Sequence, residues 1–225
     1  LEVFYTFPLP PKAMVSSFTA RVGDAVVLAE LKEKQAAREI YRKALAKGDS
    51  GFLLERHRED IFQVSLGRIE PNEQITIEIS YVEEVALVDG SIRWLLPTVV
   101  APRYIPEAPQ VSSEGPGTAR PNIRVPDADY ITPPVGVAEY TLGFSAEISL
   151  PGGVSSVSSP SHALNVTVDG QGSTTVTLGS SLERLDRDLV LICRLGSDAA
   201  NTTQVGSTSQ GDFVHIRITP ELPSL

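Results

Sequence analysis

Only one segment of this chain has the residue spacing of a helix, and this most constrains what the chain can fold into. Residues 33–47 contain strong helix formers and no Gly or Pro. Their spacing predicts one amphipathic helix, which should end at Gly48, a residue that tolerates the left-handed conformation. The expected buried stripe of this helix consists of Ala37, Ile40, Tyr41, Ala44 and Leu45.

The rest of the first half has the pattern of strands and turns. Residues 62–66 and 75–82 alternate apolar and polar side chains, so each strand should bury one face, and the turn at 70–73 should join them as a pair. Asp89-Gly90 then predicts a hairpin, because Asp-Gly between apolar runs favours a tight two-residue turn.

The second half is separated from the first by a proline-rich segment. Residues 105–134 predict a long surface connection and a domain boundary, because proline denies strand pairing. Beyond it, five strand patterns follow one another at 140–150, 164–168, 174–178, 188–193 and 213–218. The expected fold is mainly β: an antiparallel β-sandwich with one amphipathic α-helix over 1–104, then a second β-sandwich-like region over 135–225.

Eight short sequence islands also occur in a fixed order across the first 104 residues. They are Phe7-Pro8-Leu9-Pro10, Glu33-Lys34 with Ala37, Ile40-Tyr41 and Gly48, Leu53-Leu54-Glu55, Phe62-x-Val64, Gly67-x-Ile69-x-Pro71-x-Glu73, Ile79-x-Tyr81, Leu96-Pro97-Thr98 and Pro102-Arg103-Tyr104. Any one of them is a weak signal, whereas eight in this order are specific.

Together the islands resemble the VIT domain of vault and inter-alpha-trypsin proteins. The resemblance implies an interaction module rather than an enzyme, usually found ahead of a von Willebrand factor A domain. The A domain's Asp-x-Ser-x-Ser motif, suited to a divalent cation, does not occur in the sequence, and neither does the Asp-Pro-His-Phe site of inter-alpha-trypsin heavy chains. We therefore expect no metal site, no cofactor and no glycosaminoglycan attachment.

The resemblance also bears on the start of the chain. VIT domains normally have further strands before Phe7-Pro8-Leu9-Pro10, so a chain that begins at Leu1 reads as a fragment with an exposed sheet edge. Such an edge should pair with another strand. The candidate partners are the protein's own removed segments, another protein or a second copy of the chain.

Composition and charge narrow the classes of partner. The chain is 41% hydrophobic and has no apolar run that could cross a bilayer. Its formal charge of −9 opposes binding to nucleic acid or to an anionic membrane, since both require a basic face. The single cysteine, Cys193, fits a reducing compartment, whereas the sequons at Asn165 and Asn201 are typical of secreted proteins, so the compartment stays open.

Few residues suggest chemistry. The best enzymatic candidate is segment 55–60, where His57 lies near Glu55, Glu59 and Asp60, but alternating charges favour a solvated, mutually paired loop. His162 and His215 have no ligand spacing, and Cys193 is expected to be a small buried hydrophobe.

We therefore expect no catalytic, cofactor-binding or metal-binding residues. The sequence favours a non-catalytic protein-interaction or scaffold module. The alternative is a carbohydrate-binding, lectin-like sandwich, which would need aromatic side chains exposed together. Only 6% of the residues are aromatic, and Trp94 lies inside a predicted strand.

Overall fold

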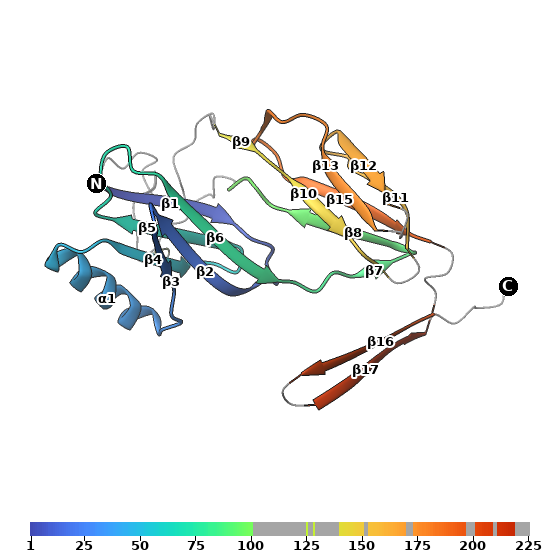
Figure 1. Ribbon diagram of the computed structural model, residues 1–225, viewed down its shortest axis with the longest axis horizontal. Helices are drawn as coiled ribbons and strands as arrows, with labels where there is room; N and C mark the ends of the chain where they lie inside the picture. The colour runs from blue at the N-terminus through green and yellow to red at the C-terminus, as the bar shows by residue number, and fades with distance from the viewer. Residues whose placement is uncertain are drawn as a thin grey trace. The chain divides into compact units, whose positions relative to one another are not determined.

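The computed structural model describes residues 1–100, 125, 128, 140–150, 153–169, 173–196, 201–208 and 211–218. Within them the chain is mainly β with one helix, α1 (Lys34–Lys47), as the sequence predicts. Two compact units are present: unit 1 contains Leu1–Glu84, and unit 2 contains Val85–Leu95 and the described residues from Tyr140 onward (Figure 1). Among all the described residues, no helix is long and apolar enough to span a membrane.

Unit 1 consists of two three-stranded antiparallel sheets that face one another. The first has the order β1-β5-β4 and the second β3-β2-β6. Their strands are β1 (Glu2–Pro8), β2 (Met14–Val22), β3 (Ala25–Leu28), β4 (Gly51–Arg56), β5 (Ile61–Gly67) and β6 (Ile75–Val82). Phe18 on β2 packs with Val64 and Leu66 on β5, so the apolar core lies between the two sheets.

β5 is the central strand of its sheet, and all seven of its residues are buried. The prediction that this strand has one solvated face is wrong, because α1 contacts the face opposite the core at Gly67. Buried Gln63, on that face, donates a hydrogen bond of 3.1 Å from Nε2 to Thr6 Oγ1. In contrast, β6 alternates along its length as predicted.

The predicted pairing of residues 62–66 with 75–82 is also wrong. β5 pairs with β1 and β4, whereas β6 pairs with β2 in the other sheet. The turn between them forms as expected, with Asn72 at φ 64° and the Glu73 N–H donating to the Glu70 carbonyl at 3.2 Å. This turn therefore carries the chain from one sheet to the other.

The ends of α1 follow from its capping residues. Glu33 is the N-cap, and its carboxylate accepts hydrogen bonds from the backbone N–H groups of Gln35 and Ala36 at 3.0 and 3.2 Å. These bonds lower the pKa of Glu33. Gly48 adopts φ 97° and ends the helix, which confirms the predicted end.

A pair of glycines seats α1 against the first sheet. Gly51 on β4 lies opposite Gly67 on β5, and Tyr41 and Leu45 of the helix occupy the space where their side chains would be. The Tyr41 hydroxyl donates a 2.7 Å hydrogen bond to Glu2 Oε1, which ties the helix to β1. The pKa of Tyr41 is raised, mainly because its side chain is buried and also because of the hydrogen bond to Glu2 and the negative charge of Glu2.

The predicted stripe of α1 needs a correction. Tyr41 is the one residue of the helix that is fully buried, and Ala37, Ala44 and Leu45 are half-buried. Ile40 is 55% exposed. The helix contacts the sheet on its Tyr41 and Leu45 side, which leaves Ile40 outside the core.

Unit 2 is built from short antiparallel strands. Its sheets have the orders β10-β13-β12, β11-β15-β8-β7, β14-β9 and β16-β17. The strands are β7 (Leu87–Val88), β8 (Ser91–Leu96), β9 (Thr141–Leu142), β10 (Ser145–Ile148), β11 (Val154–Ser158), β12 (Leu164–Val168), β13 (Thr174–Leu178), β14 (Glu183–Arg184), β15 (Leu189–Leu195), β16 (Asn201–Thr208) and β17 (Gly211–Ile218). Asp89-Gly90 forms the predicted hairpin turn, with both residues at positive φ.

The two units divide the chain differently from the expected domains. Val85–Leu95 lies within the expected first domain of residues 1–104 but belongs to unit 2, because β8 lies next to β15 in one sheet. The predicted connection over 105–134 falls outside the described residues except for Val125 and Ala128. Its extent therefore stays a prediction.

Candidate interaction surface

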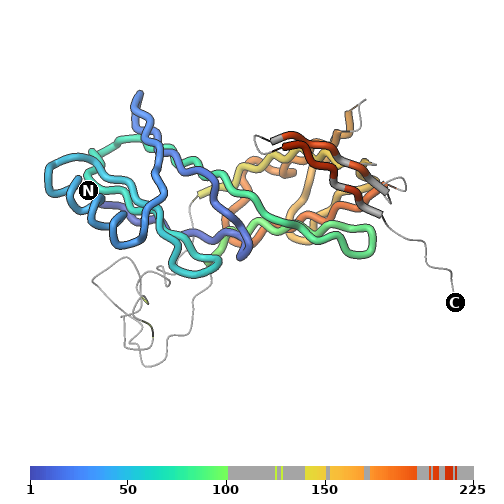
Figure 2. The backbone as a smooth tube through the Cα atoms, turned by 90° about the horizontal axis from the view of Figure 1, so that it is seen from below, coloured from blue at the N-terminus to red at the C-terminus, as the bar shows by residue number. Residues whose placement is uncertain are grey.

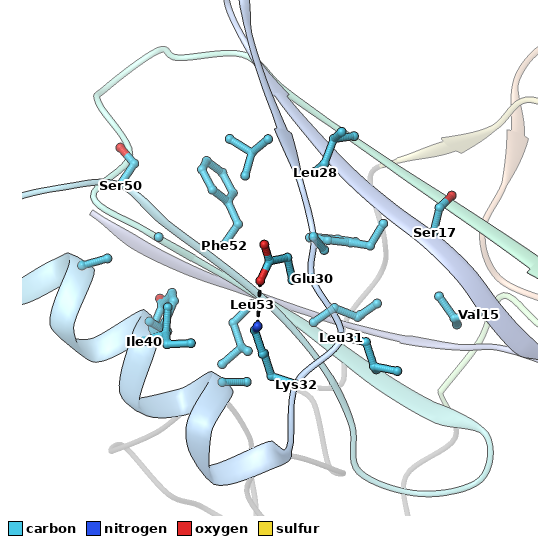
Figure 3. A pocket seen from close by; sticks show the side chains of 18 of the residues that line it. Val15, Ser17, Leu28, Glu30, Leu31, Lys32, Ile40, Ser50, Phe52 and Leu53 are labelled. Atoms are coloured by element: carbon cyan, nitrogen blue, oxygen red, sulfur yellow. Dashed lines mark ion pairs between the residues drawn. The ribbon is translucent and has the colours of Figure 1, made fainter.

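Unit 1 contains a groove of about 670 Å³ between α1 and strands β2, β3 and β4 (Figure 3). Its walls are mostly apolar. The larger apolar side chains that line it are Val15, Phe18, Val22, Val27, Leu28, Leu31, Ile40, Phe52, Leu53 and Leu54. Phe52 and Leu54 also pack on the core, so the groove reaches inward to the interior of the unit.

The local sequence explains why the groove is open. Gly23, at φ 55°, and Asp24 form a tight turn between β2 and β3, and the β2–β3 hairpin (blue) projects from the unit in Figure 2. All four residues of β3 are exposed, although the strand is apolar. The chain then crosses to α1 through Leu31, whose side chain is fully exposed. Gly23-Asp24 between apolar runs is a hairpin signal in the sequence, but this hairpin was not among the predicted elements.

Charged side chains flank this apolar surface. Lys32 Nζ and Glu30 Oε2 form an ion pair of 2.8 Å at the groove, drawn as a dashed line in Figure 3. Lys43 and Lys47 follow Ile40 by three and seven residues, so they extend along the same side of α1. Lys43 pairs with Glu39 at 3.8 Å, and both side chains are largely exposed.

The candidate catalytic segment is a loop over residues 57–60, as expected, but it is only partly solvated. Glu55 is part of β4 and is buried, as is His57. Glu55 Oε1 accepts a 2.6 Å hydrogen bond from Arg38 Nε of α1, a residue outside segment 55–60. This ion pair therefore fixes the helix to the sheet. Arg56 Nη2 donates to the carbonyl of Glu59 at 2.7 Å. Over the described residues, no three His, Cys, Asp or Glu side chains are grouped as metal ligands.

Most of unit 1 matches one known protein family. Residues 1–81 match the model of the vault protein inter-alpha-trypsin domain. This chain carries a VIT domain. The groove, α1 and both three-stranded sheets lie within it or within three residues of its end.

Relatives show how far the similarity extends past the VIT domain. Human von Willebrand factor A domain-containing protein 5A is 32% identical over 197 residues, or 85% of this chain and 24% of the relative. Mouse protein mono-ADP-ribosyltransferase PARP4 is 29% identical over 184 residues, or 81% of this chain and 9% of the relative. A von Willebrand factor A domain-containing protein of Dictyostelium discoideum is 31% identical over 104 residues. The chain thus spans about a quarter or less of the length of these relatives.

Outside the VIT domain, the titratable residues singled out from the sequence are dispersed. His162 is buried, and its Nδ1 lies 2.9 Å from Ser161 Oγ. The pKa of His162 is lowered, mainly because the side chain is buried and also because of the positive charge of Arg187. Cys193 is buried on β15 as expected, and burial raises the pKa of its thiol. His215 lies on β17, in a different sheet from Cys193, and His162 lies in a bend before β12, outside any strand.

Aromatic side chains do not gather on one exposed surface of the VIT domain. Tyr5 stacks on Phe7 with ring centroids 5.6 Å apart, and Phe7 stacks on Phe62 at 6.1 Å. Phe7 and Phe62 pack with the core, and Tyr5, which is half-exposed, ends the row. In unit 2, Trp94 is partly buried and lies 5.9 Å from Phe144. None of the three relatives above is named for carbohydrate binding.

Proposed function

We propose that this chain is a non-catalytic protein-interaction module whose VIT domain contributes a binding surface rather than chemistry. The observation that carries the proposal is the apolar groove beside α1. Ile40 is 55% exposed and Leu31 is fully exposed, and together with Leu28 they border the groove. Contiguous exposed apolar surface is typical of interaction sites in soluble proteins.

The relatives support the same interpretation. They are named for von Willebrand factor A domains or for mono-ADP-ribosyl transfer, and this chain aligns with only 24% and 9% of the two vertebrate relatives above. We infer that in a longer protein this region binds a neighbouring domain or a protein partner. The buried, ion-paired state of Glu55 fits a structural role better than general base catalysis, which needs a reactive group within reach.

The proposal is tested with a charge placed in the groove. Purified protein and its Ile40→Asp variant serve as baits in lysate of the cells that express it, and retained proteins are identified by mass spectrometry. Val88→Asp is the matched control, because Val88 on β7 is similarly exposed at 63% but lies outside the groove. We expect one partner protein to bind the unchanged protein and the Val88→Asp variant but not the Ile40→Asp variant. When that partner is purified and tested by itself, it should bind the unchanged protein directly.

The same three proteins are applied to a glycan array. Saturable binding to one class of glycan that Ile40→Asp leaves unchanged, with no protein partner sensitive to that variant, would contradict the proposal. That result would favour the carbohydrate-binding alternative.

A further inference from the structure

The edge of the second sheet beside the groove has backbone groups available for another strand. Val22 and Ala25 close the two-residue β2–β3 hairpin, so these two residues form a hydrogen-bonded pair. Because hydrogen-bonded pairs alternate along an antiparallel ladder, Ala20 and Val27 form the next one. The Ala29 N–H donates to the Phe18 carbonyl at 3.0 Å, which continues the same alternation. The N–H and C=O groups of Val26 and Leu28 therefore point away from β2, toward the outer edge.

Nothing in the described residues covers this edge. β3 is the terminal strand in the order β3-β2-β6, and the backbone hydrogen bonds of the described chain give Val26 and Leu28 no partner on the outer side. Val26 is 51% exposed and Leu28 75%. Proteins usually protect such an edge with Lys, Pro or a bulge, but Ala25–Leu28 contains none of these. The strand is therefore suited to pairing.

The groove lies where the side chains of an added strand would point. Side chains of a strand alternate between the two faces of its sheet, so every second residue of a strand beside β3 would face the groove. Figure 3 shows Leu28 and Leu31 on one side of the groove and Ile40 across from them on α1. Apolar side chains up to the size of Leu would fit a groove of about 670 Å³.

The charge of α1 indicates the charge of the segment that would bind at this edge. The helix carries Lys34, Arg38, Arg42, Lys43 and Lys47 against one acidic residue, Glu39. Arg38 is bound to Glu55 and Lys43 pairs with Glu39 at 3.8 Å, but Lys43 and Lys47 are both exposed and lie three and seven residues after Ile40 on the same side of the helix. A local cationic rim on a chain of net charge −9 favours an acidic ligand at this place.

We propose that an extended segment of a partner protein pairs with β3 as a fourth strand of the β3-β2-β6 sheet. Its alternate apolar side chains enter the groove, and an acidic flank lies against Lys43 and Lys47. This is recognition by strand addition, in which backbone hydrogen bonds provide affinity and side-chain pockets provide specificity. The inference rests on the proposed interaction function and specifies its site and ligand chemistry.

The probe is a fluorescein-labelled ten-residue peptide with two glutamates followed by alternating Thr and Val or Leu, measured by fluorescence polarisation. Leu28→Pro removes the outward N–H of β3 without touching the bonds to β2, because proline is tolerated at sheet edges. Leu28→Ala is the matched control, since it shortens the side chain but keeps that N–H. Far-UV circular dichroism checks that both variants fold.

We expect Leu28→Pro to weaken peptide binding about tenfold or more, and Leu28→Ala to stay within about threefold of the unchanged protein. A peptide N-methylated at the N–H groups facing β3 should lose binding equally. Replacing the two glutamates by lysines, or changing Lys43 and Lys47 to Glu, should also weaken binding. This charge effect should shrink at high salt.

Three results would overturn the inference. If Ile40→Asp abolishes peptide binding while Leu28→Pro binds normally, the groove is used without strand addition, and the proposed function stands. If no binding is seen at millimolar peptide, this ligand chemistry is wrong, although a partner captured in the lysate experiment would still support an interaction role. If sedimentation shows a dimer that Leu28→Pro dissociates, the occupant is a second copy of the chain rather than a partner segment.

Discussion

The packing of α1 against Gly67 on the first sheet leads to a quantitative prediction about stability. A Cβ at Gly67 would contact Leu45 Cδ2 at less than a van der Waals distance and would lie 2.8 Å from the Tyr41 hydroxyl. Overpacking of this kind costs about 1–3 kcal/mol. Displacing Tyr41 would also weaken its hydrogen bond to Glu2, a loss of about 1 kcal/mol.

An opposing contribution is smaller. The backbone of Gly67 is not at positive φ, so alanine is sterically allowed there, and replacing glycine in a strand by alanine gains about 0.5–1 kcal/mol. We therefore expect Gly67→Ala to lower the free energy of unfolding by about 1–3 kcal/mol. The loss should appear in urea melts followed at 222 nm, where α1 contributes most.

Two further variants make this prediction refutable. Gly143→Ala is the control, because no atom lies within 4 Å of its added Cβ and its φ is not positive, so its effect should stay within about 0.5 kcal/mol. Leu45→Ala combined with Gly67→Ala should lose less stability than the sum of the two single changes, since the shorter side chain makes room. A neutral Gly67→Ala, or strict additivity, would show that α1 does not rest on this glycine pair.

Three more predictions concern single side chains. Ile40→Ala should cost no more than about 1 kcal/mol in a denaturant melt, because Ile40 is more than half exposed; a loss of 2 kcal/mol or more would mean the groove is closed in solution. Arg38→Ala should cost about 1–3 kcal/mol, because it leaves the buried carboxylate of Glu55 without its 2.6 Å partner; an unchanged melt would refute that role. The pKa of His162 is lowered in the folded protein, so the unfolded chain takes up the proton first, and the stability this residue contributes is complete above about pH 6.5 and declines below it. His162→Gln should make the fall in stability between pH 7 and 5 shallower, and an identical pH profile would contradict this.

Local signals in the sequence predicted several elements well. Helix formers followed by Gly48 defined α1, and alternating Val and Thr defined β12 and β13 with the bounds that the structure shows. Such signals act between near neighbours in the chain, so a single sequence contains them. β11 was missed because its serines have low strand propensity, and β16 because its residues are mostly polar.

Features that depend on distant parts of the chain could not be predicted in the same way. The burial of both faces of β5 depends on where α1 packs, and the exposure of Ile40 depends on the space between the helix and the β2–β3 hairpin. The groove has the same origin, since it lies where edges from two sheets meet the helix. Apolar spacing along α1 indicates which residues share a side, but not whether another element covers that side.

The place of β8 in unit 2 has a consequence for synthesis on the ribosome. β8 is made early, but its sheet neighbour β15 follows about 100 residues later. At about 5–20 residues per second, roughly 5–20 s pass before β15 is available, and during this time Ile92, Trp94 and Leu95 lack that neighbour. The VIT domain can complete its sheets first, while β8, which follows it in the chain, lacks β15 until residues 189–195 are made. A fragment cut at residue 104 would retain β8 but never receive β15, whereas a cut after Glu84 would leave no such unpaired strand.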